Sequence, residues 1–265
     1  MSRFSVLVFH RAVGFVHQSI PDTVEAITTL GADHGFDVTS TDDPAQFTPD
    51  LLGLHQVVAF AHTSGDVLPE PSQRRAIEGF IRSGGGFFGI HGASSMDADV
   101  RTDWPWFVEL VGAKFKGHTN ACFYCDEPLE IPGVAAGGSL DRAPVDAEWL
   151  GDDLAMVSWE DAVLHVEDGA CPAARGLRDG ATYAEEWYGF EENPRPWVNV
   201  VATVDEATYE PHKGWMGDDH PVIWWREFDG GRSVYNSMGH AKARWREKWF
   251  LESVLGGIEL AAGAS

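Results

Sequence analysis

The sequence predicts an α/β fold with a parallel sheet covered by helices on both faces, and three observations support this prediction. Short apolar runs, such as residues 3–10 and 56–61, have the length and composition of buried strands. Segments in which apolar residues follow helical spacing, such as residues 71–82, lie between these runs. Glycines at 84–86 end a helical segment just before the next strand. Strands that alternate with helices pair in parallel, so their carboxyl ends meet at one edge of the sheet.

Each element follows from a local signal in the chain. Pro21 and Pro71 stand where the first turn of a helix tolerates proline, and Gly230 with Gly231 indicates a hairpin turn. The first part of the chain is expected to contain strands at 3–10, 36–40, 56–61 and 87–90. Its expected helices are one that opens at 19–22, a short helical turn at 49–54 and an amphipathic helix at 71–82. The rest is expected to contain a helix at 105–111, strands at 121–129, 162–166, 194–204, 221–228 and 233–236, and a closing helix at 247–262.

The size of the chain favours one folded unit. A chain of 265 residues with 44% hydrophobic residues can bury a large core without dividing into several domains. We expect residues 1–265 to form a single domain, with an irregular, β-rich insertion at about 104–180.

The charge of the chain limits its partners and its location. The 19 basic and 41 acidic residues give a net charge of -22, which repels nucleic acids and anionic membranes. Since no leader or membrane-spanning pattern is visible, we expect a cytoplasmic protein with no nucleic-acid or membrane partner. Three cysteines are too few for a disulfide framework, and Cys122 and Cys125 would point to opposite faces of an expected strand.

The run 84–95 (GGGFFGIHGASS) is the most informative motif. A buried strand followed by a sharp glycine-rich turn lifts one side chain above the edge of the sheet, which is the geometry of a nucleophile elbow. Hydrolases and amidotransferases of this kind carry Ser or Cys at the elbow, whereas this chain carries His91. A glutaminase reaction is therefore not expected. The alternative is a hydrogen-bonded histidine at a glycine-rich strand end.

Aromatic residues beside polar groups suit sugar binding. Eleven tryptophans occur in the chain, and Trp104 and Trp187, the latter followed by Tyr188, adjoin polar or charged residues. The alternative is that each indole fills the core and bonds its N–H to a partner.

Several separated motifs follow one another along the chain: 14–20 (GFVHQSI), 84–95, 104–113 (WPWFVELVGA), 116–118 (KGH), 174–177 (ARGL), 185–188 (EEWY), 203–206 (TVDE), 219–222 (DHPV) and 238–240 (MGH). Taken together, these blocks resemble the ThuA-like (trehalose utilisation) family. The resemblance implies a flavodoxin-like three-layer sandwich, as in class I glutamine amidotransferases, and a role in carbohydrate utilisation, often of oxidised sugars such as 3-keto-glycosides. Two positions depart from the family pattern, Cys171 and Thr119, where histidine and proline are common.

The polar residues of these blocks are the candidates for a shared site. We expect His91 and His240 to act as an acid and base pair, with Glu186 orienting them or acting as a second acid. For His220, which precedes a proline and an expected strand, a purely structural role is the competing interpretation. The expected substrate-binding residues are His17, Trp104, His118, Trp187, Tyr188, Asp219 and His220.

The sequence leaves open whether the protein binds a metal ion. The chain has no HExxH and no HxH motif, so a zinc or other divalent site would require ligands from distant loops. No other cofactor is expected.

Two functions remain open. The first is an enzyme that acts on a glycoside or an oxidised (3-keto) sugar through histidine and carboxylate acid–base chemistry. The second is a non-catalytic sugar-binding or regulatory module on an amidotransferase-like scaffold. The tryptophan-rich insertion could also form the face of a homodimer.

Overall fold

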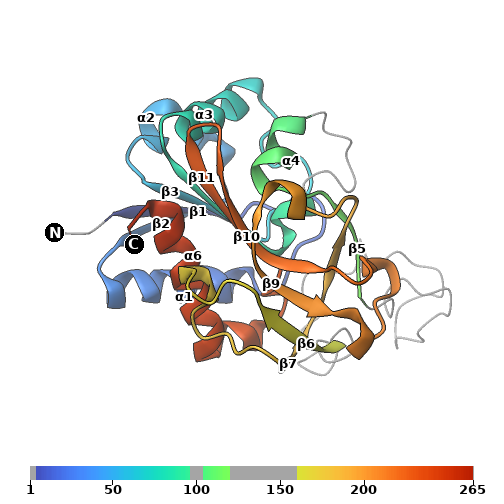
Figure 1. Cartoon of the computed structure of the whole chain (residues 1–265). Helices are drawn as coiled ribbons and strands as arrows, with labels where there is room; N and C mark the ends of the chain where they lie inside the picture. The colour runs from blue at the N-terminus through green and yellow to red at the C-terminus, as the bar shows by residue number, and fades with distance from the viewer. Residues whose placement is uncertain (1–3, 96–103, 120–159, 265) are drawn as a thin grey trace, which may run out of the picture.

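The computed structural model describes residues 4–95, 104–119 and 160–264. In this part of the chain a nine-stranded sheet has the order β2-β1-β3-β4-β11-β10-β9-β6-β7 (Figure 1). Along this order, each strand from β2 as far as β11 pairs in parallel with its neighbour. From β11 onward to β7, neighbouring strands pair antiparallel. The α/β class with a parallel central sheet is therefore confirmed.

The strands of the parallel half are β2 (Asp37–Thr41), β1 (Ser5–Phe9), β3 (Val57–Ala61), β4 (Gly86–Ile90) and β11 (Gly231–Asn236). Those of the antiparallel half are β10 (Pro221–Phe228), β9 (Asn199–Asp205), β6 (Glu160–Val166) and β7 (Ala181–Glu185). A separate two-stranded sheet joins β5 (Phe115–His118) to β8 (Tyr188–Phe190).

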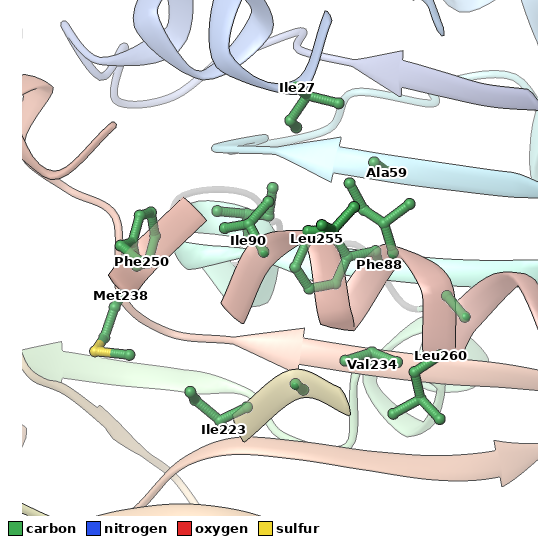
Figure 2. Close-up of a cluster of buried hydrophobic side chains, with 14 of the residues drawn as sticks. Ile27, Ala59, Phe88, Ile90, Ile223, Val234, Met238, Phe250, Leu255 and Leu260 are labelled. Carbon is green, nitrogen blue, oxygen red and sulfur yellow. The ribbon is translucent and has the colours of Figure 1, made fainter. Parts of the chain in front are cut away.

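Helices cover both faces of the parallel half. One face carries α1 (Ile20–His34) and α6 (Lys248–Ala262), and the other carries α2 (Pro49–Leu52), α3 (Pro71–Arg82) and α4 (Pro105–Val111). Side chains alternate along each strand, so in β1 Val6 and Val8 join the α1 and α6 core while Leu7 and Phe9 join the other. Figure 2 shows the first of these cores, in which Phe88, Ile90 and Leu255 lie close together.

Most element boundaries agree with the sequence-based expectation. The strand expected at 194–204 begins only at Asn199, because Arg195–Trp197 form a short 3-10 helix after Pro194. Strands β5, β7 and β8 were not expected, since each is short and lacks a long apolar run. The strand expected at 121–129 lies outside the described residues, as does much of the expected insertion. Among the described helices, none is both long and apolar enough to cross a bilayer.

Candidate active site

Two histidines follow adjacent parallel strands at their carboxyl ends. His62 comes directly after β3 and His91 directly after β4, and their backbone φ angles are 54° and 45°. Side chains with a Cβ rarely adopt this left-handed region, and such strain is concentrated at functional sites. The sharp turn expected at position 91 is therefore present, and it sets the His91 imidazole at the edge of the sheet.

The His91 ring is oriented by the neighbouring strand. Its Nδ1 lies 2.6 Å from the carbonyl oxygen of Ser237, just after β11, so Nδ1 carries a proton and donates it to that oxygen. The other nitrogen, Nε2, lies 3.1 Å from Nδ1 of His240 and 3.2 Å from Oε2 of Glu186. The expected acid and base pair is thus in direct contact with the expected carboxylate.

Glu186 is the electrostatic centre of this group. Its Oε2 lies 2.8 Å from Nδ1 of His240, and its Oε1 lies 3.2 Å from Nδ1 of His118. Burial alone raises the pKa of the Glu186 carboxyl, but His240 and His118 outweigh it and hold that pKa well below its usual range. Burial lowers the pKa of His240, yet the Glu186 carboxylate outweighs it and raises that pKa. The two side chains therefore form an ion pair.

His17 and His62 complete a cluster of imidazoles. The His17 ring centroid lies 4.8 Å from that of His91, 5.2 Å from that of His240 and 5.0 Å from that of His62. Burial lowers the pKa of both His17 and His62 well below its usual value, and the neighbouring imidazoles lower it further. Both rings are therefore neutral, and His62 belongs to the cluster although it was not among the candidate site residues.

The small β5 and β8 sheet supplies two more expected residues. It brings His118 to Glu186. It also carries the buried Tyr188, whose ring centroid lies 4.1 Å from that of His91. Thr119 accepts the Trp187 N–H on its hydroxyl at 2.8 Å and donates its own N–H to the Trp187 carbonyl at 2.9 Å. A proline at position 119 could make neither bond, so Thr119 itself joins the end of β5 to the segment before β8.

A second carboxylate, which sequence reasoning missed, positions the first. Glu185 is fully buried, and its Oε1 accepts the N–H of Glu186 at 3.0 Å. Its Oε2 accepts the N–H of Gly239 at 3.0 Å and lies 3.3 Å from Nε of Arg244. Glu185 thereby ties the end of β7 to the loop that carries His240. The only sequence signal was a pair of adjacent acidic residues in the EEWY block.

The expected tryptophan surfaces need correction. Trp187 is fully buried and its indole N–H donates to the Glu160 carbonyl, while the buried Trp104 donates to Glu78 where α3 and α4 meet. Neither ring offers a face to a sugar. Both follow the alternative interpretation, in which a large indole fills the core and its N–H is satisfied.

Asp219 and His220 also lie outside the cluster. Nε2 of His220 donates to the Tyr188 carbonyl at 2.8 Å, and its Nδ1 lies 2.9 Å from Oε1 of Glu206. Asp219 accepts hydrogen bonds from Arg195 and Asn193. The expected substrate-binding role is not supported for either residue, because their polar atoms are engaged in structural contacts.

The Glu206 contact with His220 leads to a prediction for pH-dependent stability. Burial raises the pKa of Glu206, but hydrogen bonds from His220 and from the backbone of Met216 and Gly217 outweigh it and lower that pKa. We expect Glu206→Gln to reduce the free energy of unfolding at pH 7 by about 1.5–3 kcal/mol, the scale of hydrogen bonds to charged groups. Urea unfolding checks this value, with the exposed Glu210→Gln as control.

The sign of the pH effect follows from the lowered pKa. A carboxyl whose folded-state pKa lies below its unfolded value stabilises the protein fully above the unfolded pKa of about 4.3. This contribution is lost as the pH falls through the folded-state pKa. The difference between wild type and Glu206→Gln should therefore shrink below about pH 5. A difference that stays constant down to pH 3.5 would contradict the assignment.

Comparisons with solved structures support the fold. A protein described as ThuA-like from Bacteroides uniformis ATCC 8492 aligns with a TM-score of 0.70 at 19% identity, over 98% of this chain and 91% of that chain. Another, from Parabacteroides merdae ATCC 43184, aligns with a TM-score of 0.65 at 18% identity, over 98% of this chain and 90% of that one. PurLQS from Thermotoga maritima aligns with a TM-score of 0.50 at 12% identity, over 97% and 99% of the two chains.

The flavodoxin-like, amidotransferase-like architecture implied by the sequence is thereby confirmed. No curated protein matches the chain. The family model described as ThuA, trehalose utilisation, matches residues 5–261. This match spans nearly the whole sequence and includes every residue of the histidine and glutamate cluster, and the chain therefore belongs to the ThuA family, a family of carbohydrate utilisation.

Proposed function

We propose that this protein is an enzyme that acts on a glycoside or an oxidised (3-keto) sugar, with His91, His240 and Glu186 as its catalytic groups. One observation carries the proposal: two imidazoles and a carboxylate from three distant segments meet within 3.2 Å of one another. The cluster is accessible to solvent at one side, because the His240 and His118 side chains are 21% and 24% exposed. Imidazoles held by a carboxylate at the edge of a sheet are suited to moving protons.

The proposed reaction on a 3-keto-glycoside is an elimination. The neutral Nε2 of His91 accepts the proton from the carbon next to the ketone, and the electron pair of that bond forms a carbon–carbon double bond. The ketone oxygen gains the negative charge, which the His240 imidazolium stabilises by a hydrogen bond or a proton. When the carbonyl re-forms, the glycosidic oxygen on the next carbon leaves with its bonding pair and takes the proton from His91. No further reactant is needed.

Glu186 acts on both imidazoles in this scheme. Its Oε2 contacts His240 and His91, and its Oε1 contacts His118. A carboxylate in this place holds a proton on Nδ1 of His240 and fixes the orientation of that ring, whereas the Ser237 carbonyl fixes the tautomer of His91. A glutaminase reaction lacks support, because the elbow carries His91, and Cys171 lies in the core that packs on α6.

An exposed ring beside the cluster suits a sugar better than the buried tryptophans. Phe15 is 54% exposed and stands edge-on to His17, with ring centroids 4.9 Å apart. Its carbonyl accepts a hydrogen bond from the Ser64 hydroxyl at 2.6 Å, which fixes the loop. We propose Phe15 as a stacking surface for the sugar.

A cytoplasmic location and a homodimer remain predictions.

The test is a turnover assay on a panel of 3-keto-glucosides and unmodified disaccharides. We expect product from the keto sugars, and we expect Phe15→Ala to raise KM roughly 2- to 10-fold at unchanged kcat, from a stacking energy of about 0.5–1.5 kcal/mol. Leu54→Ala, at another exposed apolar residue, is the control and should change neither constant. Saturable sugar binding by calorimetry without any product would instead support the non-catalytic alternative.

A further inference from the structure

Four donor side chains of the site converge on one point. One donor atom each from His17, His91, Glu186 and His240 lies within 4.8 Å of the other three. Three of these atoms, Nε2 of His91, Nδ1 of His240 and Oε2 of Glu186, are separated by only 2.8, 3.1 and 3.2 Å. Donor atoms about 2.0–2.1 Å from a tetrahedral zinc ion lie about 3.3 Å apart. The observed triangle is therefore close to the size that such an ion requires.

Among these three atoms there are too few protons for each contact to be a hydrogen bond. His91 carries its proton on Nδ1, where it bonds to Ser237, so Nε2 presents a lone pair. The ionised Glu186 carboxylate also presents only lone pairs. The one proton between the three atoms is the proton on Nδ1 of His240. A divalent cation in its place would satisfy all three atoms at once.

His17 provides an independent observation. Its side chain is buried, and its Nδ1 has no hydrogen-bond partner among the described residues. A buried polar nitrogen without a partner is costly, and such groups in native proteins usually have a ligand, a water or an ion. A metal ion bound to the His17 ring would hold it in place beside His91 and His240.

The surroundings resemble the outer shell of a metal site. Metal-bound histidines usually donate their second ring N–H to a carbonyl or a carboxylate, as His91 does to Ser237. The second oxygen of Glu186 contacts His118, which would hold the carboxylate in its orientation. Glu185 fixes the backbone of both Glu186 and Gly239, so two donors are positioned before any ion arrives.

We propose that His17, His91, Glu186 and His240 bind one divalent transition-metal ion, with zinc as the best match to three imidazoles and a carboxylate. The inference deepens the proposed function and relies on it only for the use of the ion. The ion would polarise the sugar carbonyl in place of the His240 imidazolium. Because the ion would also occupy the lone pair of His91 Nε2, another imidazole would accept the proton in its place. His118, which touches Glu186, lies outside the four donors and is 24% exposed, would be suited to this role.

The test is a titration of untagged protein that has been stripped with a chelator. Isothermal calorimetry with Zn²⁺ should show one ion per chain, and Co²⁺ should give visible absorption typical of a nitrogen-rich site. We expect His17→Ala and Glu186→Gln to weaken binding at least tenfold. His165→Ala is the matched control, because His165 is 49% exposed on β6 and pairs only with Asp179 among the described contacts; it should bind like wild type.

Each result decides a separate point. Absence of stoichiometric binding, or wild-type affinity in both His17→Ala and Glu186→Gln, would overturn the metal site. Circular dichroism checks that the variants fold, and His17→Gln and His240→Gln replace any that do not. Zinc binding without turnover of any sugar would refute the proposed function but not the metal site. Turnover that survives chelation in a protein that binds no zinc would refute only the metal site.

Discussion

Replacing Glu186 by glutamine is expected to lower kcat/KM for the sugar substrate by about 100- to 10,000-fold, the usual contribution of a positioned acid or base. The amide keeps the size of the carboxyl group but removes the charge that holds His240 and His118. The amide N–H₂ group would also donate a hydrogen bond to Nε2 of His91 and so occupy the lone pair that accepts a proton in the proposed reaction. The loss should appear mainly in kcat, because the substitution acts on proton movement.

The matched control is Glu191→Gln, the same chemical change at an exposed glutamate that pairs with Lys114 on the surface. Its kcat/KM should remain within about twofold of wild type, since exposed ion pairs contribute little. Thermal unfolding of both variants shows whether they are folded, and His240→Asn repeats the test from the other side of the ion pair. Full activity in folded Glu186→Gln would exclude the proposed chemistry at this cluster.

The parallel half of the sheet was predictable because its signals are local. Helix α3 begins at Pro71 and ends at Arg82 as expected, and the glycines after it release the chain into β4. The same local pattern predicted that the residue after β4 would stand at a sharp turn, and His91 has the positive φ angle that this requires. Parallel pairing then places the carboxyl ends of β3, β4 and β11 together without further information.

The members of the site were only partly predictable. His17, His91, Glu186, His240, His118 and Tyr188 do lie together, but they come from five separate segments, and their grouping depended on the family resemblance more than on any spacing. Trp104, Trp187 and His220 failed as ligand-binding candidates because burial is decided by the tertiary fold. A tryptophan beside a glutamate has the same sequence whether its ring faces solvent or the core. Glu185 was missed because its partners, Gly239 and Arg244, are more than fifty residues away.

Arg244→Met is expected to lower the free energy of unfolding by about 3–5 kcal/mol, because it leaves the carboxylate of Glu185 buried without its cation. The Arg244 guanidinium donates to Glu185, to Glu247 and to the Ala184 carbonyl, and it lies over the ring of Trp249. Methionine retains the apolar stem but none of these donors. Urea unfolding at pH 7 measures the loss, and Arg246→Met is the control, since Arg246 is 80% exposed and should change stability by no more than about 0.5 kcal/mol.

A double variant distinguishes two causes of this stability loss, an unpaired buried charge and a general packing defect. If the unpaired Glu185 carboxylate causes the loss, then Glu185→Gln combined with Arg244→Met should be more stable than Arg244→Met alone. Equal or lower stability of the double variant would assign the loss to packing on Trp249 instead. Because Glu185 also holds the N–H groups of Glu186 and Gly239, the same unpaired charge should disturb both sides of the catalytic ion pair. Stability and turnover should therefore fall together in Arg244→Met.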